Sequence, residues 1–232
     1  MISAKSCWRI AIGIVVWSAL CSVLMAQQGG GLTSAPATLT FALDFPESNP
    51  EHYSIVVESS GHTRYESTAT VAEDSEKQNY RAEFEMSGEN RQKIFEWAKQ
   101  AKYFGQIIDS GNGKLAFTGA KVLSYQDGQR SNTARYDYSN LTPVRQLTVL
   151  FQNIAATMEY GRRLTYYHRY QKLALDEELK RMEAQAKNND LSEIQGVGPV
   201  LQEIYDDVSV INGVRARAKE LMEMGSGATA KR

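Results

Sequence analysis

Cysteine, proline and histidine are all scarce in this chain. Its 232 residues include two cysteines, five prolines and three histidines. Both cysteines, Cys7 and Cys21, stand in an apolar opening segment, so the chain after that segment can form no disulfide, catalytic thiolate or cysteine-ligated metal site. The histidines, His52, His62 and His168, are far apart and make no metal-ligand motif. We therefore expect no cofactor.

An excess of one charge sign is also missing. The 26 basic and 27 acidic side chains give a formal net charge of -1, which offers no electrostatic reason to expect a nucleic-acid or anionic-membrane partner. The chain has no Gly-x-Ser-x-Gly nucleophile elbow, no phosphate-binding P-loop and no His-Glu-x-x-His pair. Enzymatic activity stays open on these grounds, but we favour a protein that is not an enzyme.

The first residues carry the clearest signal that is present. Lys5 and Arg9 precede a stretch from 10 to 25 that is apolar and uncharged, and Ala26 follows it. A positive, then apolar, then small order is typical of a secretion signal. Residues 1–26 are therefore predicted to be a signal peptide, which makes the protein periplasmic or secreted.

A retained anchor is the competing interpretation of the same segment. Leu24 stands where a small residue usually precedes a cleavage site. If the segment is not cut, residues 10–26 would tether the protein to the inner membrane, although the apolar stretch is short for a span of about 20 residues. In either case no other part of the chain is expected to contact a membrane.

Strand patterns dominate the part of the chain that follows a Gly-rich flexible linker at 27–37. Apolar and polar residues alternate from 38 to 45, as in a half-buried strand. Similar patterns lie at 53–58, 63–70, 80–86, 115–125 and 131–138, the last two flanking the hairpin signal Asp127-Gly128. One helix is predicted between Ser87, a good N-cap, and Gly105. Residues 38–140 thus form a predicted β-rich α+β domain.

Helical periodicity replaces the strand pattern from Thr142 onward. Thr142 is the predicted cap, Pro143 the first helical residue, and apolar residues recur at helical spacing up to Met158. Further helices are predicted at 175–186, after 190 or 192, and at 208–224, before a disordered tail at 225–232. Strands first and helices second define an α+β fold: a mostly antiparallel N-terminal sheet with one helix, then a helical segment, 141–224, of three to four helices. The helices either cover one face of the sheet or form a second domain.

The combination of leader, linker, β-rich half and helical half resembles a known kind of protein. The β-rich half contains IFEWAKQAKYF at 94–104 and KLAFTGAKVLSY at 114–125. In this order of parts the chain resembles exported bacterial α+β proteins of uncharacterised function, over most of residues 38–224. The resemblance implies export and fold class, and it implies no activity.

The run Tyr166-Tyr167-His168-Arg169-Tyr170 is the first candidate site. Tyrosine and arginine are enriched at contact surfaces, so this run, or an edge of the sheet, is a predicted interaction surface for another envelope protein. Two other interpretations stay open. His168 could act as a base in a hydrolase, or the tyrosines could simply pack the helix against the sheet with their hydroxyls at the rim.

The segment Gly196-Val197-Gly198-Pro199 is the second candidate. It resembles the hairpin of helix-hairpin-helix DNA-binding modules, in which a glycine turn brings backbone amides to a phosphate. The resemblance covers residues 191–205 and would imply an exported DNA-binding protein. Gln202 departs from the small residue expected there, and the surroundings are acidic. We favour a plain turn, or a helix start with Pro199 in its first turn.

These observations together predict an exported, non-enzymatic protein-interaction module. DNA binding through the glycine hairpin and hydrolysis near His168 are the two alternatives.

Overall fold

The computed structural model describes residues 36–46, 48–70 and 76–230. The predicted signal peptide or anchor, and most of the predicted linker, lie outside these residues and stay predictions. Residues Ser34–Arg232 form one compact unit. Within its described part, none of the helices combines the length and the hydropathy that crossing a bilayer requires.

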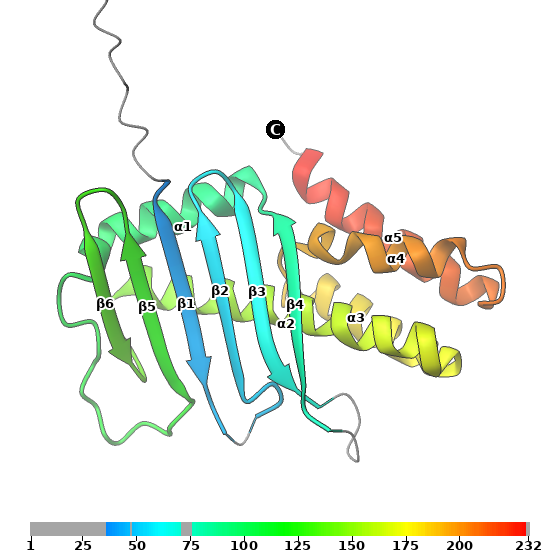
Figure 1. Cartoon of the computed structure of the whole chain (residues 1–232), viewed down its shortest axis with the longest axis horizontal. Coiled ribbons are helices and arrows are strands. Elements are labelled where there is room, and N and C mark those ends of the chain that lie inside the picture. Colours follow the sequence, from blue (N-terminus) through cyan, green and yellow to red (C-terminus); the bar gives the residue numbers. More distant parts are fainter. Residues whose placement is uncertain (1–35, 47, 71–75, 231–232) are drawn as a thin grey trace, which may run out of the picture. The chain divides into compact units, whose positions relative to one another are not determined.

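A six-stranded sheet occupies the N-terminal half of this unit (Figure 1). Its strands are β1 (Thr38–Asp44), β2 (His52–Glu58), β3 (His62–Ala69), β4 (Gln78–Glu85), β5 (Ala120–Gln126) and β6 (Ser131–Tyr136). They lie in the order β4-β3-β2-β1-β5-β6, and every neighbouring pair is antiparallel. The two edges of the sheet are therefore β4 and β6.

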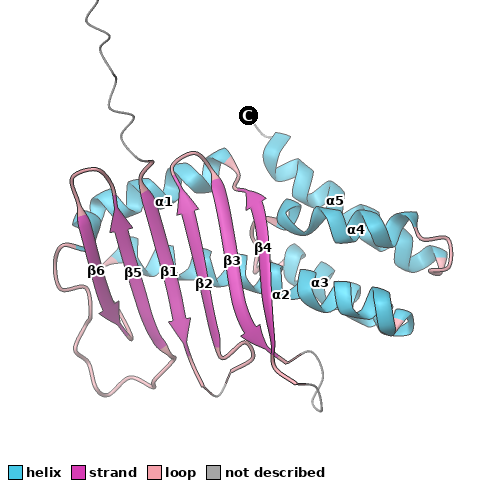
Figure 2. Ribbon diagram, in the orientation of Figure 1, coloured by secondary structure: helices cyan, strands magenta, loops and turns pink. Residues whose placement is uncertain are grey.

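Helices cover one face of the sheet (Figure 2). The covering helices are α1 (Gly88–Gln100) and α2 (Thr142–Tyr170). Alternate residues of β1, Leu39, Phe41 and Leu43, are buried beneath them, and the Phe41 ring stacks on Phe151 of α2 with 5.1 Å between ring centroids. The period of two in the strand sequences thus separates a core face from an open face.

The remaining helices are α3 (Leu175–Lys187), α4 (Gly198–Asp206) and α5 (Asn212–Ala230), with 3₁₀ turns η1 (Lys102–Phe104), η2 (Lys172–Ala174) and η3 (Ile194–Val197). The 29-residue α2 contacts α1 and β2 as well as α3 and α4. Its first half lies against the covered face of the sheet, and its second half packs among the C-terminal helices (Figure 1). The predicted α+β class, with an antiparallel sheet followed by helices, is confirmed.

Several element boundaries differ from the prediction. α4 begins at Gly198 rather than just after 190 or 192, and α5 begins at Asn212 rather than at 208. β5 begins at Ala120 rather than near Leu115, since Gly119 has a φ of +94°, outside the extended region. α2 begins at Thr142 with Leu141, not Thr142, in the cap position and without a side-chain cap.

The predicted disordered tail is wrong for most of its length, because α5 continues to Ala230. Gly225 packs closely against η3 within this extension. A Cβ at Gly225 would lie 3.0 Å from the backbone nitrogen of Gln195, so the absence of a side chain lets α5 approach η3 closely and keep a packing partner beyond Met224.

The aromatic stack at the centre of the core supplies a stability test. Replacing Phe151, which is fully buried, in Phe151→Ala should lower the free energy of unfolding by about 3–5 kcal/mol through lost burial and a cavity. Urea unfolding followed by circular dichroism measures this. Val149→Ala, at an exposed position of the same helix, should change it by less than about 0.5 kcal/mol. Equal effects of the two variants would contradict the described orientation of α2.

Candidate binding site

A buried ion pair lies in the second half of α2. The Nε of Arg162 is 2.6 Å from Oε2 of Glu159, and the two side chains are 5% and 4% exposed. Oε1 of Glu159 accepts hydrogen bonds from the Tyr65 hydroxyl at 2.8 Å and the Ser67 hydroxyl at 2.6 Å, both on β3. A buried charge is tolerated when it is paired and its lone pairs are satisfied. This network therefore ties α2 to β3.

One nitrogen of the Arg162 guanidinium has no hydrogen-bond acceptor among the described residues. Nη2 donates to the carbonyl oxygen of Thr70 at 3.0 Å, while Nη1 is buried and is the nitrogen without a described acceptor. A buried donor without an acceptor costs about 1–3 kcal/mol. Arg162 also lines a surface cleft. A ligand in this cleft is a candidate acceptor for Nη1.

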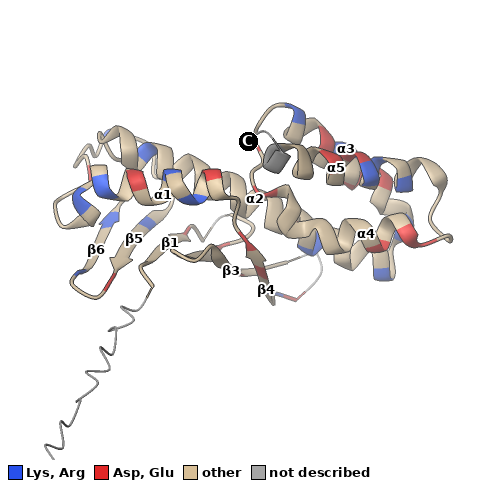
Figure 3. Ribbon diagram, turned by 90° about the horizontal axis from the view of Figure 1, so that it is seen from above, with Lys and Arg blue, Asp and Glu red and all other residues tan. Residues whose placement is uncertain are grey.

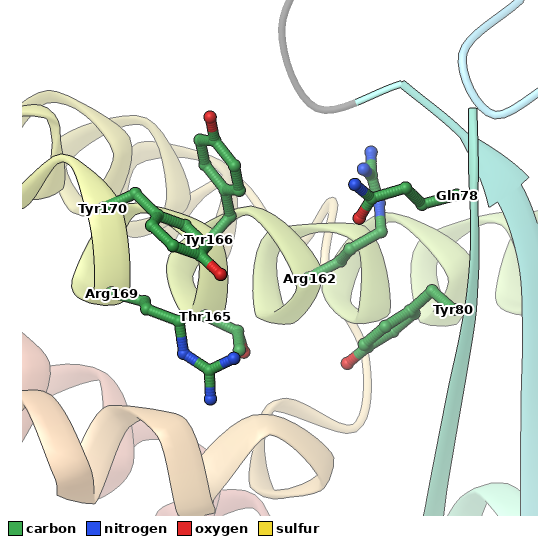
Figure 4. A pocket seen from close by; sticks show the side chains of 7 residues that line it. All are labelled: Gln78, Tyr80, Arg162, Thr165, Tyr166, Arg169 and Tyr170. Carbon is green, nitrogen blue, oxygen red and sulfur yellow. The ribbon is translucent and has the colours of Figure 1, made fainter. Parts of the chain in front are cut away.

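That cleft, of about 460 Å³, opens between the start of β4 and the end of α2 (Figure 4). Its seven lining residues are Gln78 and Tyr80 from β4, with Arg162, Thr165, Tyr166, Arg169 and Tyr170 from α2. The α2 residues are spaced three, four, seven and eight positions apart, which places them on one face of the helix. None of the seven is acidic, so the lining is aromatic and cationic.

The cleft presents donors and aromatic rings rather than charged oxygens. Burial, and then the charge of Glu159, raise the pKa of Tyr80 to about 12, so its phenol stays protonated at neutral pH. The rings of Tyr166 and Tyr170 have centroids 5.1 Å apart, and the Arg169 guanidinium carbon lies 6.0 Å from the centre of the Tyr170 ring. Tyr170 is 64% exposed, so this wall is open to a partner.

The predicted surface 166–170 is divided between two sides of α2. Tyr166, Arg169 and Tyr170 line the cleft. Tyr167 is half-buried against the hydrophobic core, as the packing interpretation expects. His168 points elsewhere, with its Nε2 2.9 Å from Oδ2 of Asp207. The structure thus brings together three of the five predicted residues.

The hydrogen bonds around His168 join the end of α2 to the loop after α4. Oδ2 of Asp207 also accepts a bond from Lys172 Nζ at 2.6 Å, and Oδ1 accepts from the Ser209 hydroxyl at 2.7 Å. Lys172 first, and then Ser209, hold the pKa of Asp207 far below its usual range. The Ser209 hydroxyl bonds to the carboxylate and not to the imidazole, which is not the nucleophile–base geometry of acyl transfer. No described group of His, Cys, Asp and Glu residues could hold a metal ion either.

The glycine hairpin forms the start of α4. Pro199 lies in the first turn of this helix, as the favoured interpretation expects. The amide of Gly196 donates to the carbonyl of Glu193 at 2.8 Å, and the amide of Gly198 donates to the carbonyl of Gln195. A Cβ on Gly196 would lie 2.7 Å from the Met158 side chain. The glycine amides are therefore engaged within the chain, and Gly196 serves close packing.

A buried carboxylate stands directly before this hairpin. Glu193 is 5% exposed, and its oxygens accept bonds from the Ser87 amide at 2.8 Å, the Ser87 hydroxyl at 2.6 Å and Asn90 Nδ2 at 2.6 Å. Ser87 also caps α1, as predicted. Glu193 thus joins the start of α1 to η3, and its negative charge opposes a phosphate at the hairpin.

The chain matches no protein-family model and no curated protein. The fold and the cleft define an α+β protein with an aromatic, cationic cleft at one edge of its sheet. Sequence reasoning missed four lining residues, Gln78, Tyr80, Arg162 and Thr165. The available signal was the pair Glu159 and Arg162, two charges three residues apart inside an apolar helical segment.

Glu193 generates a stability prediction. Glu193→Ala leaves the Ser87 and Asn90 donors without an acceptor, so the free energy of unfolding should fall by about 2–3 kcal/mol. Glu193→Gln, which keeps the shape but not the charge, should cost less. The exposed neighbour Asp190 provides the control, and Asp190→Ala should change stability by less than about 0.5 kcal/mol. A Glu193→Ala protein as stable as the control would refute the proposed tie.

Asp207 generates a pH prediction. A carboxylate whose pKa is lowered on folding adds stability above its unfolded pKa of about 3.9, and that stability is lost as pH falls towards the folded pKa. Asp207→Asn should therefore lower the urea midpoint at pH 7, and the difference from the unaltered protein should shrink in acid. Asp206→Asn, whose carboxylate bonds only to Gln202 among the described residues, should show no such pH dependence.

Proposed function

We propose that the protein is an exported, non-enzymatic interaction module that binds another protein through the cleft between β4 and the end of α2. The leader-like sequence at 1–26 supports export. The cleft supports binding, because exposed tyrosine and arginine side chains line it on one face of α2, and no described acidic residue occupies that lining. This lining is the observation on which the proposal depends.

The position of the cleft at a sheet edge favours an extended partner segment. β4 is an edge strand, and an edge strand offers backbone groups to which a further strand can bond. Towards its end, β4 is packed against η3, where Gly196 lies beside Phe84. At its start, Gln78 and Asn79 are exposed. A segment that runs along the start of β4 therefore leads into the cleft.

Arg169 and Tyr170 have the character of interface anchors. Both are exposed. No described residue forms an ion pair or hydrogen bond with the Arg169 guanidinium, which lies 6.0 Å from the centre of the Tyr170 ring. Tyrosine and arginine side chains dominate the binding energy at many interfaces. On α1 and α3, by contrast, acidic and basic residues interleave (Figure 3), and many pair within the helix, which suits a solvated surface.

Site-specific cross-linking tests the function. With the photoreactive residue p-benzoylphenylalanine at position 170, irradiated cells that export the protein should yield one discrete adduct. The same residue at position 149, an exposed site on the first half of α2, should yield none. Adding Arg169→Ala to the first variant should reduce the adduct by about thirtyfold or more, since removal of an interface anchor costs about 2 kcal/mol or more. Adducts of equal yield at 149 and 170, or none at 170, would contradict the proposal.

A further inference from the structure

We propose that the group which the cleft receives from its partner is a carboxylate on a polypeptide, bound at Nη1 of Arg162. This inference rests on the proposed function and names the chemistry of the contact. It begins from the buried donor of Arg162, for which no described acceptor exists.

Arg162 is held in place for this role by its other two nitrogens. Glu159 binds Nε and the Thr70 carbonyl binds Nη2. A guanidinium is a planar fork, so two fixed nitrogens also fix the direction of the third. Nη1 is thus an oriented donor, and a charge-assisted bond to a carboxylate is about twice as strong as a neutral one.

Gln78 is the exposed neighbour to which the proposal assigns access to this donor. It is exposed and lies beside the Arg162 guanidinium in the cleft (Figure 4). Turning of this side chain opens a path to the buried nitrogen, and its carboxamide can then donate to the second oxygen of the ligand. The Tyr170 and Tyr80 hydroxyls point towards the space between them (Figure 4).

The charges around the cleft favour a carboxylate over a phosphate. The charge of Arg162 is balanced by Glu159, whose Oε2 is 2.6 Å from its Nε. Arg169 has no described carboxylate partner, so the lining carries one uncompensated positive charge. A monoanion neutralises that charge. A dianion would bring excess negative charge close to Glu159, where repulsion is weakly screened.

The aromatic wall and the edge strand favour a polypeptide as the carrier. The neighbouring rings of Tyr166 and Tyr170, tilted by 50° to each other, offer apolar surface beside the cationic groups. The volume of about 460 Å³ is that of a small ligand site, enough for one acidic side chain or a chain terminus. A segment beside the start of β4 presents such a group directly to the cleft.

Three aromatic probes of similar shape test the anion preference by NMR titration of the isotope-labelled protein. Benzoate, a monoanion, should bind saturably in the millimolar range and shift the amide resonances of Gln78, Tyr80 and Thr165. Benzamide, which is neutral, should bind about tenfold more weakly because the charge-assisted bond is lost. Phenyl phosphate, a dianion, should bind no more tightly than benzoate.

A pair of neighbouring variants tests the place of binding. Gln78→Glu puts a carboxylate of the chain itself beside Arg162 Nη1, so benzoate affinity should fall at least tenfold while the protein becomes no less stable, an effect about the size of one charge-assisted bond. Asn79→Asp adds the same charge at the next exposed position, whose side chain bonds to Thr68 on the open face. It should change the affinity by only about twofold.

Several results would overturn the inference. Equal binding of benzoate and benzamide, resonance shifts confined to another surface, or an unchanged affinity in Gln78→Glu would each exclude a carboxylate at Arg162. Phenyl phosphate that binds more tightly than benzoate would replace the carboxylate with a phosphate. If cross-linking at 170 succeeds while benzoate fails, this inference falls and the proposed function stands. If benzoate binds and no adduct forms, the proposed function falls instead.

Discussion

A single buried charge pair determines where the second half of α2 lies. Glu159 and Arg162 lose nearly all contact with water, so each has to find partners inside the protein. β3 supplies them for Glu159 through Tyr65 and Ser67. The backbone of Thr70 supplies one for Arg162. Any shift of α2 along the sheet would break several of these bonds together, and the cleft at the end of the helix depends on that position.

Polar ties also join the helices to one another and to the sheet. Glu193 connects η3 with the start of α1 through Ser87 and Asn90, and Asp207 connects the loop after α4 with the end of α2 through His168. Each tie uses a carboxylate with several donors, which makes it directional in a way that hydrophobic burial is not. The C-terminal helices are thus placed by oriented bonds as well as by packing.

The two motifs that stand out in the sequence have different outcomes in the structure. In the glycine segment 196–199, Gly196 packs against Met158, and its backbone amide donates a hydrogen bond within the chain. The tyrosine run is split, because a helix turns by about 100° per residue and five consecutive residues cannot share one face. Tyr166, Arg169 and Tyr170 share the cleft face, whereas His168 lies on another. The tyrosine-rich composition of 166–170 indicated the right part of α2 but not the right set of side chains.

Local pattern alone determined the strands, the long helix and the α+β class. The alternation in β1 and the spacing of apolar residues in α2 report directly on which side of an element is buried. The cap at Ser87 is a local feature of the same kind. Only the tertiary structure decided that Gln78 and Tyr80 meet Arg162, and that Glu159 meets Tyr65, a partner 94 positions away in the chain. Such contacts depend on strand order and on how α2 crosses the sheet, and neither is encoded in the periodicity of any one segment.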